Sequence, residues 1–175
     1  MTSKEILDLL SEIEYGWLDK DNIKHYIIDE NYSKNYILQT PEEVIKNKIG
    51  VCWDQTELER FYFDKLGISV KTYFIVYYDG DKCPTHTFLT YKDDENIYWF
   101  EHSWLKYKGI HKYKSSKELL VDVRNKFIVD ELKDNYNKYN LCVFEYLKPK
   151  YGISVQDFYK HCENGKKIYF SRSGL

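Results

Sequence analysis

The sequence predicts an α+β fold, in which helices come first and mainly antiparallel strands follow. Apolar residues recur at helical spacing in residues 3–15 and 52–66, residues 16–50 are less regular, and from Ile68 apolar and polar residues alternate. A chain of 175 residues is long enough to bury the core of one domain. No internal repeat or Pro/Gly/Ser-rich linker divides it, so we expect residues 1–175 to form a single domain. Helices and strands that occur in separate runs are typical of α+β architecture.

Two short helices are expected before residue 50. The first covers residues 3–15, with Ser3 as a plausible cap, and the second covers residues 40–48. Thr40 and Pro41 are a favoured cap and first helical residue, and Gly50 marks where this helix has stopped. The apolar positions of the first helix are Ile6, Leu7, Leu10 and Ile13.

A longer helix is expected from Cys52 to Leu66. Asp54 and Glu57 suit the positive amino end of this helix, and Gly67 is a natural cap at its carboxyl end. One apolar stripe should face the core. It contains Leu58, Phe61, Tyr62 and Leu66.

Three strands are predicted next, over residues 68–78, 85–91 and 97–104. Their bounds are set by turn-forming residues at 79–81 and 93–96. Beyond them we expect a helix, a strand, a short helix and a last extended piece. These elements cover residues 116–132, 141–147, 154–162 and 168–171. The lysine-rich stretch 106–117 between strands and helix is interpreted as a solvated loop.

Composition and charge narrow the classes of partner. Aromatic residues make up 18% of the chain and include eighteen tyrosines, which favours sheets with one wet face. A net charge of −2 argues against a nucleic-acid partner bound mainly through charge. There is no signal-peptide pattern and no long apolar run, so we expect no membrane partner.

The four cysteines are few and irregularly spaced, which predicts reduced thiols in a cytoplasmic protein rather than a disulfide framework. Cys83 and His86 have a spacing that zinc sites use. No second pair of metal-ligand spacing accompanies them, so neither a metal nor a cofactor is expected. Oligomeric state is not predictable from these features.

Cys52 is the first candidate for chemistry because it lies at the expected amino end of a helix. That position lowers a thiol's pKa from about 8.5 toward neutrality, and only the thiolate attacks well. Unpaired N–H groups there can also stabilise an oxyanion. Gly50 permits a close approach of the chain just before the helix. Taken alone, however, a cysteine at a helix start is most often a packing residue.

His86 and Glu101 strengthen the interpretation because they lie on neighbouring predicted strands. If the hairpin turns symmetrically about Asp93 and Asp94, the two side chains are directly opposite. Glu101 would then fix the imidazole tautomer and leave the other ring nitrogen for a thiolate. A slip of one residue would instead pair His86 with His102 and turn Glu101 to the other face.

These residues resemble the transglutaminase-like superfamily of the papain-type fold, in its bacterial form. That family has a helix opened by a cysteine in a Gly-x-Cys context, a strand with histidine, and a neighbouring strand ending in an acid. Gly50 and Cys52 match the first element, His86 the second, and Glu101 the third, where most members have aspartate. The resemblance covers residues 40–104. It implies a catalytic helix packed on a mainly antiparallel sheet.

The resemblance further implies that Cys52 is the nucleophile, His86 its acid–base partner and Glu101 the residue that orients His86. The reaction would be acyl transfer or hydrolysis at an amide-type bond of a peptide or protein, through a thioester. Peptidase, deamidase and transglutaminase activities remain open. Gln39 is a candidate oxyanion residue with a loop role as its alternative. Trp53 is a candidate groove residue with core packing as its alternative.

A different function is also compatible with the same fold. The superfamily includes members that keep the fold and have lost the chemistry, so a catalytically inactive protein-binding module is the alternative to an enzyme. The intact cysteine and histidine favour the enzyme. Reactivity of the thiol distinguishes the two.

Overall fold

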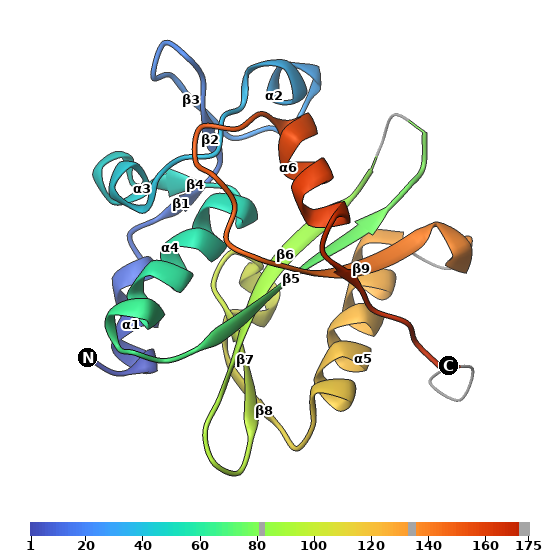
Figure 1. Ribbon diagram of the computed structural model, residues 1–175. Helices are drawn as coiled ribbons and strands as arrows, with labels where there is room; N and C mark the ends of the chain where they lie inside the picture. Colours follow the sequence, from blue (N-terminus) through green and yellow to red (C-terminus); the bar gives the residue numbers. More distant parts are fainter. Residues whose placement is uncertain (81–82, 133–135, 172–175) are drawn as a thin grey trace.

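The computed structural model of the protein describes residues 1–80, 83–132 and 136–171. Helices and strands are arranged around a large antiparallel sheet (Figure 1), which confirms the α+β prediction. The helices are α1 (Ser3–Leu10), α2 (Glu30–Asn35), α3 (Pro41–Asn47), α4 (Cys52–Lys65), α5 (Ser116–Phe127) and α6 (Val155–Glu163). The strands are β1 (Glu14–Tyr15), β2 (Trp17–Leu18), β3 (Lys24–His25), β4 (Ile49–Gly50), β5 (Val70–Tyr77), β6 (Thr85–Lys92), β7 (Ile97–Glu101), β8 (Gly109–Tyr113), β9 (Leu141–Tyr146) and β10 (Lys166–Lys167).

In the described residues the largest sheet has six strands, in the order β10-β9-β5-β6-β7-β8. Strands β5 to β8 follow one another as hairpins, and every neighbouring pair in the sheet is antiparallel. Strand β9 returns to pair with β5 on the side away from β6. The sheet therefore places β6 and β7, which carry His86 and Glu101, next to each other near its middle.

Helices cover both faces of the sheet. On one face, Phe74 of β5 packs in a core cluster with Trp53 of α4 and Phe158 of α6. On the other face, Tyr73 of the same strand packs with Leu119 and other residues of α5. Figure 1 shows the same division, with α4 and α6 on one side of the sheet and α5 on the other. Side chains alternate across a strand, so β5 contributes to both cores.

The first helix is shorter than predicted, and this corrects the expected span of residues 3–15. Helix α1 ends at Leu10, and the chain then extends so that β1 pairs with β4 in parallel. Ile13 has the helical spacing of the earlier apolar residues, but it is buried from the extended segment instead. Pairing with a distant strand has overridden the local helical pattern.

The predicted basic loop at residues 106–117 is also corrected. Residues 109–113 form β8, the edge strand that pairs with β7, and Lys112 is exposed from it. Lysine on an edge strand discourages pairing with other chains, so its charge is not a sign of a loop. Helix α5 ends at Phe127 and continues as one π-helical stretch to Leu132, close to the predicted end. The predicted extended piece at 168–171 is not a strand; β10 lies just before it.

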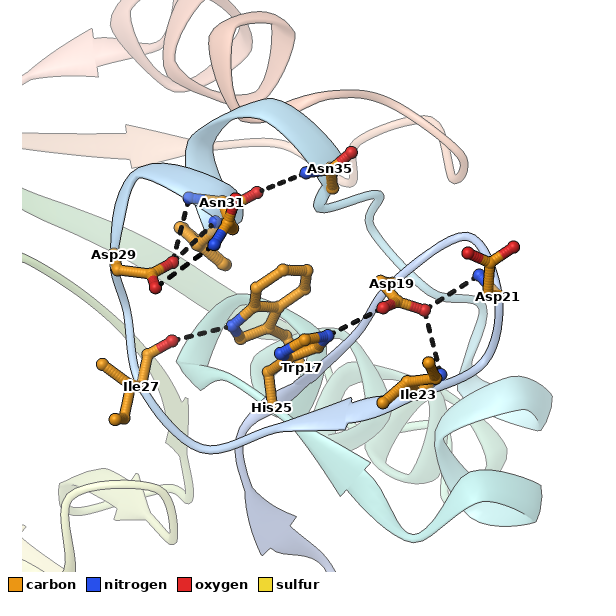
Figure 2. Close-up of polar contacts among 10 residues, drawn as sticks. Trp17, Asp19, Asp21, Ile23, His25, Ile27, Asp29, Asn31 and Asn35 are labelled. Carbon is orange, nitrogen blue, oxygen red and sulfur yellow. Dashed lines mark hydrogen bonds and ion pairs between the residues drawn. The ribbon is translucent and has the colours of Figure 1, made fainter.

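Strands β2 and β3 form a small hairpin whose centre is Trp17. The indole stacks on His25 with ring centroids 4.3 Å apart, and its Nε1 donates to the Ile27 carbonyl at 3.0 Å. His25 Nε2 lies 2.8 Å from Asp19 Oδ2, while Asp19 Oδ1 accepts the Ile23 N–H at 2.9 Å. Figure 2 shows these contacts closing the hairpin around the indole. These contacts fix Trp17, and with it the point at which residues 15–16 enter the hairpin.

Candidate active site

Cys52 is the first residue of α4, as the sequence predicts, and only 4% of its surface is exposed. Val51 is the N-cap residue, and Gly50 precedes it in β4. A Cβ atom on Gly50 would lie 2.8 Å from the Cβ of Asp54, so glycine is required for the turn to fold back onto the helix. The thiol therefore lies at the positive end of the α4 dipole.

Asp54 holds the turn that precedes the thiol. Its Oδ2 accepts the Val51 N–H at 3.0 Å, and its Oδ1 accepts the Gln39 N–H at 3.0 Å and the Tyr36 hydroxyl at 2.8 Å. Burial raises the pKa of Asp54 to about 7, although these three donors act in the opposite direction. The carboxyl group thus joins α4 to the residues on both sides of α3.

Gln39 lies close to this turn, but its side chain has a bracing role. Its Nε2 donates to the Ile49 carbonyl at 3.0 Å, and its Oε1 accepts from Asn47 at 3.1 Å. Both ends of the amide are thus bonded to the segment between α3 and Cys52. The arrangement supports the structural alternative for Gln39 rather than the oxyanion hypothesis.

His86 and Glu101 are bonded to each other. His86 Nε2 lies 2.8 Å from Glu101 Oε2, and both residues are buried. Glu101 also accepts from Trp99 Nε1 at 3.2 Å, from the Ser103 hydroxyl at 3.1 Å and from the Trp104 N–H at 2.8 Å. Four donors therefore fix the carboxylate, and Nδ1 of the imidazole is left for another partner.

The hairpin register differs from the expected one by two residues. Observed partners such as Leu89 and Phe100 sum to 189, whereas a direct His86–Glu101 pair sums to 187. Asp93 Oδ1 accepts the N–H of Asn96 at 2.7 Å, which closes the turn one residue further along than predicted. A shift of two keeps both side chains on one face, so His86 meets Glu101 diagonally. The slip that would have paired His86 with His102 does not occur.

His86 also interacts with Cys52. Burial disfavours a charged His86, but the Glu101 carboxylate and the Cys52 sulfur outweigh it and raise the pKa of His86 to about 10. Burial likewise opposes ionisation of Glu101, yet His86 and the surrounding donors lower the pKa of its carboxyl group. At neutral pH these directions favour a charged Glu101–His86 pair facing the sulfur.

Trp53 and His102 make packing and hydrogen-bond contacts beside these residues. Trp53 is buried and stacks on Phe158 with ring centroids 4.2 Å apart, which supports core packing rather than a groove. His102 Nδ1 lies 2.6 Å from Gln55 Oε1, and Gln55 Nε2 donates to the Gly50 carbonyl at 2.8 Å. Burial and the positive charge of Lys108 lower the pKa of His102 to about 4, so it braces the turn as a neutral group.

Two residues at the site were not identified from the sequence. Tyr15 of β1 has a hydroxyl that interacts with both the side chain and the backbone of Cys52. Glu59 of α4 is buried, its Oε2 has no hydrogen-bond partner, and its charge interacts with Glu101, His86 and Cys52. Glu59 follows Cys52 by seven residues, so helical spacing could have predicted that both residues lie on one face of α4. Tyr15 had no such signal, because a long-range strand pair positions it.

No protein-family model matches this chain, and no curated protein matches it either. The resemblance to transglutaminase-like enzymes therefore remains a prediction that rests on the residues described above. All four cysteines are free thiols. Among the described residues, no cluster of His, Cys, Asp and Glu is arranged to hold a metal ion. No helix within the described ranges is long and apolar enough to cross a membrane.

Together the residues provide the parts of a thiol-based acyl-transfer site. A thiol at a helix start is the potential nucleophile, an imidazole beside it is the potential acid–base group, and a buried carboxylate orients that imidazole. The N–H groups at the start of α4 are available for a developing negative charge on a substrate oxygen.

Proposed function

We propose that the protein is a cysteine-dependent enzyme that transfers or hydrolyses the acyl group of an amide-type bond in a peptide or protein. The observation that carries this proposal is the chain of interactions from Glu101 through His86 to Cys52. A buried acid that holds an imidazole toward a thiol is the arrangement that activates a cysteine nucleophile. A structural cysteine does not require such partners.

The fold supports the same proposal. The helix that begins at Cys52 packs on the antiparallel sheet through contacts such as the 3.0 Å bond between the Thr56 and Thr87 hydroxyls. Thr87 is next to His86 on β6, so this bond fixes the helix relative to the histidine strand. A papain-type, transglutaminase-like core has this combination of cysteine helix and antiparallel histidine strand.

The proposed reaction begins with attack of the Cys52 thiolate on the carbonyl carbon. A C–S bond forms, and the carbonyl π electrons move to the oxygen. When the tetrahedral species collapses, the C–N bond breaks, and imidazolium His86 gives its proton to the departing nitrogen. Water or an amine then attacks the thioester, loses a proton to His86 and releases the thiolate.

The second candidate is a catalytically inactive binding module. The observation in its favour is the burial of the thiol, since only 4% of Cys52 is exposed and a substrate must reach it. Against it, Glu101 is bonded to His86 and also accepts three further hydrogen bonds. A cluster that served packing alone would not need so many polar contacts. We therefore place the enzyme first.

Labelling with iodoacetamide at pH 6 tests the enzyme proposal against the inactive module. Cys83 is partly exposed, whereas Cys52 is buried, so accessibility alone predicts that Cys83 reacts first. An activated thiolate reverses that order. We expect peptide mass spectrometry to show Cys52 modified at least about tenfold faster than Cys83, Cys142 or Cys162. Faster labelling of Cys83, or equal slow labelling of all four, would rule out the enzyme.

The type of reaction is tested by incubating wild-type and Cys52→Ala protein with a cell lysate, with and without a tagged primary amine. Amine incorporation that requires Cys52 identifies an acyltransferase. Conversion of glutamine to glutamate identifies a deamidase, and new chain ends identify a peptidase. Equal products from the two proteins would contradict a role for Cys52.

A further inference from the structure

Tyr15 is placed beside the nucleophile by the shortest strands of the fold. Strand β1 pairs in parallel with β4, so that Tyr15 is the partner of Gly50, two residues before Cys52. The Gly16 N–H donates to the Gly50 carbonyl at 3.4 Å. This pairing fixes the backbone of residue 15 against the turn that leads into α4.

The chain on the other side of Tyr15 is equally restricted. A Cβ atom on Gly16 would lie 2.5 Å from the His25 carbonyl oxygen and 2.8 Å from the Ile49 Cδ1 atom, so only glycine fits there. Trp17 follows and is held by its stack on His25 and its bond to Ile27 (Figure 2). Tyr15 thus projects from a rigid support.

The hydroxyl of Tyr15 reaches the reacting group. It interacts with both the side chain and the backbone of Cys52, while 42% of the tyrosine surface remains exposed. Burial at the hydroxyl end, together with the Cys52 sulfur, raises the pKa of Tyr15 well above its ordinary value. The phenol therefore keeps its proton at neutral pH and is available as a hydrogen-bond donor.

We infer that Tyr15 is a second donor of the oxyanion hole, acting with the backbone N–H of Cys52. This inference rests on the proposed acyl-transfer function and adds a catalytic residue to it. A substrate carbonyl that is attacked by Cys52 must place its oxygen beside the amino end of α4. Tyr15 is the strand partner of Gly50, two residues before Cys52, and its hydroxyl interacts with the backbone and the sulfur of Cys52.

The proposed role is confined to one part of the reaction. As the C–S bond forms, the electron pair of the carbonyl π bond moves to oxygen, and the Tyr15 O–H donates a hydrogen bond to that oxygen. Tyr15 keeps its proton throughout, and His86 supplies the proton that the leaving nitrogen takes. When the carbonyl is restored, the hydrogen bond from Tyr15 weakens again.

Two reactions of the same thiol separate this role from others. Acylation of Cys52 by p-nitrophenyl acetate passes through an oxyanion, whereas alkylation by iodoacetamide does not. For Tyr15→Phe we expect the acylation rate constant, measured from the p-nitrophenolate burst, to fall about 10²–10³-fold. We expect alkylation to stay within about threefold of wild type, because the charged His86 remains beside the sulfur and alkylation forms no oxyanion. Retained selectivity of alkylation for Cys52 over Cys83, Cys142 and Cys162 also shows that the variant folds.

Tyr26→Phe is the matched control, because Tyr26 is exposed and its hydroxyl bonds Glu14 rather than Cys52. Its acylation and alkylation should both equal those of wild type. Unchanged or faster acylation of Tyr15→Phe would overturn the inference and indicate that the phenol merely covers the thiol. Equal losses in both reactions would overturn it as well, because Tyr15 would then act on the thiolate. If the wild-type protein shows no burst that depends on Cys52, the proposed acyl-transfer function is contradicted, and not only the role of Tyr15.

Discussion

His86 Nε2 and Glu101 Oε2 are 2.8 Å apart although their residues are not direct partners across the β6–β7 hairpin. The bond is diagonal, and the longer arm of glutamate suits a diagonal reach better than aspartate would. Three further donors orient the carboxylate toward His86. The presence of glutamate here is therefore consistent with the observed register of the hairpin.

Replacing Glu101 with glutamine should slow alkylation of Cys52 at pH 6 by at least about tenfold. The change removes the negative charge that raises the pKa of His86, so less imidazolium faces the sulfur. Iodoacetamide labelling followed by mass spectrometry measures the rate. Wild-type reactivity in Glu101→Gln would contradict an orienting role for the carboxylate.

Glu101→Asp is the informative comparison for the diagonal geometry. It keeps the charge and shortens the side chain by one methylene, so the bond to His86 must lengthen or the strands must shift. We expect an alkylation rate between those of wild type and Glu101→Gln. A rate equal to wild type would show that charge alone matters and that reach does not.

The stability of the protein should depend on His86 in a defined pH range. Its folded-state pKa is raised to about 10, and its unfolded value is about 6.5. The stabilisation from the charged pair is therefore fully present below about pH 6.5 and is lost as the pH rises through about 10. Denaturant unfolding of wild type and His86→Gln at several pH values isolates this contribution. The difference in unfolding free energy between wild type and His86→Gln should shrink toward pH 10. A difference that stays constant with pH would contradict the stabilising role of the charged His86.

Local signals made the cysteine helix predictable from the sequence. Gly50, Cys52 and Gly67 mark its start and end, and the structure has α4 from Cys52 to Lys65. The pairing of His86 with Glu101 was also predictable, even though the turn was placed wrongly. Side chains alternate with a period of two, so a register error of two residues leaves the same faces together.

Tyr15 lay outside what the sequence reveals, because its place depends on two-residue strands far apart in the chain. Residues 14–15 and 49–50 have no strand pattern of their own, and their pairing appears only with the tertiary fold. Apolar spacing through Ile13 favoured a continued helix instead. The choice between the two roles predicted for Gln39 also depends on tertiary contacts, since only the folded chain shows that Asn47 and Ile49 bond its amide.

Asp54→Asn should destabilise the protein by about 1–3 kcal/mol, because an amide has one acceptor oxygen for three buried donors. The donors are Val51, Gln39 and Tyr36. Since these bonds fix the turn before the nucleophile, alkylation of Cys52 should also slow. Denaturant unfolding measures the first effect and iodoacetamide labelling the second. Asp94→Asn, on the exposed turn, is the control and should change neither quantity.

Glu59→Gln should make the protein more stable than wild type above neutral pH. Burial, followed by the charge of Glu101, raises the pKa of Glu59 well above its ordinary value, and its Oε2 has no hydrogen-bond partner. A raised folded-state pKa of an acid contributes stability that is present below about pH 4.3 and is lost as the pH rises through the folded value. Glutamine cannot ionise, so that loss disappears.

Unfolding free energies of wild type and Glu59→Gln should therefore diverge as the pH is raised from 5 to 9. Glu42→Gln, at an exposed position of α3, should follow wild type throughout. Alkylation of Cys52 in Glu59→Gln should change little near neutral pH, because Glu101, which bonds His86 directly, remains the carboxylate beside the imidazole. A slower alkylation would show that the Glu59 carboxyl group contributes to the reactivity of the thiol, and parallel stability curves would show that it ionises at its ordinary pKa.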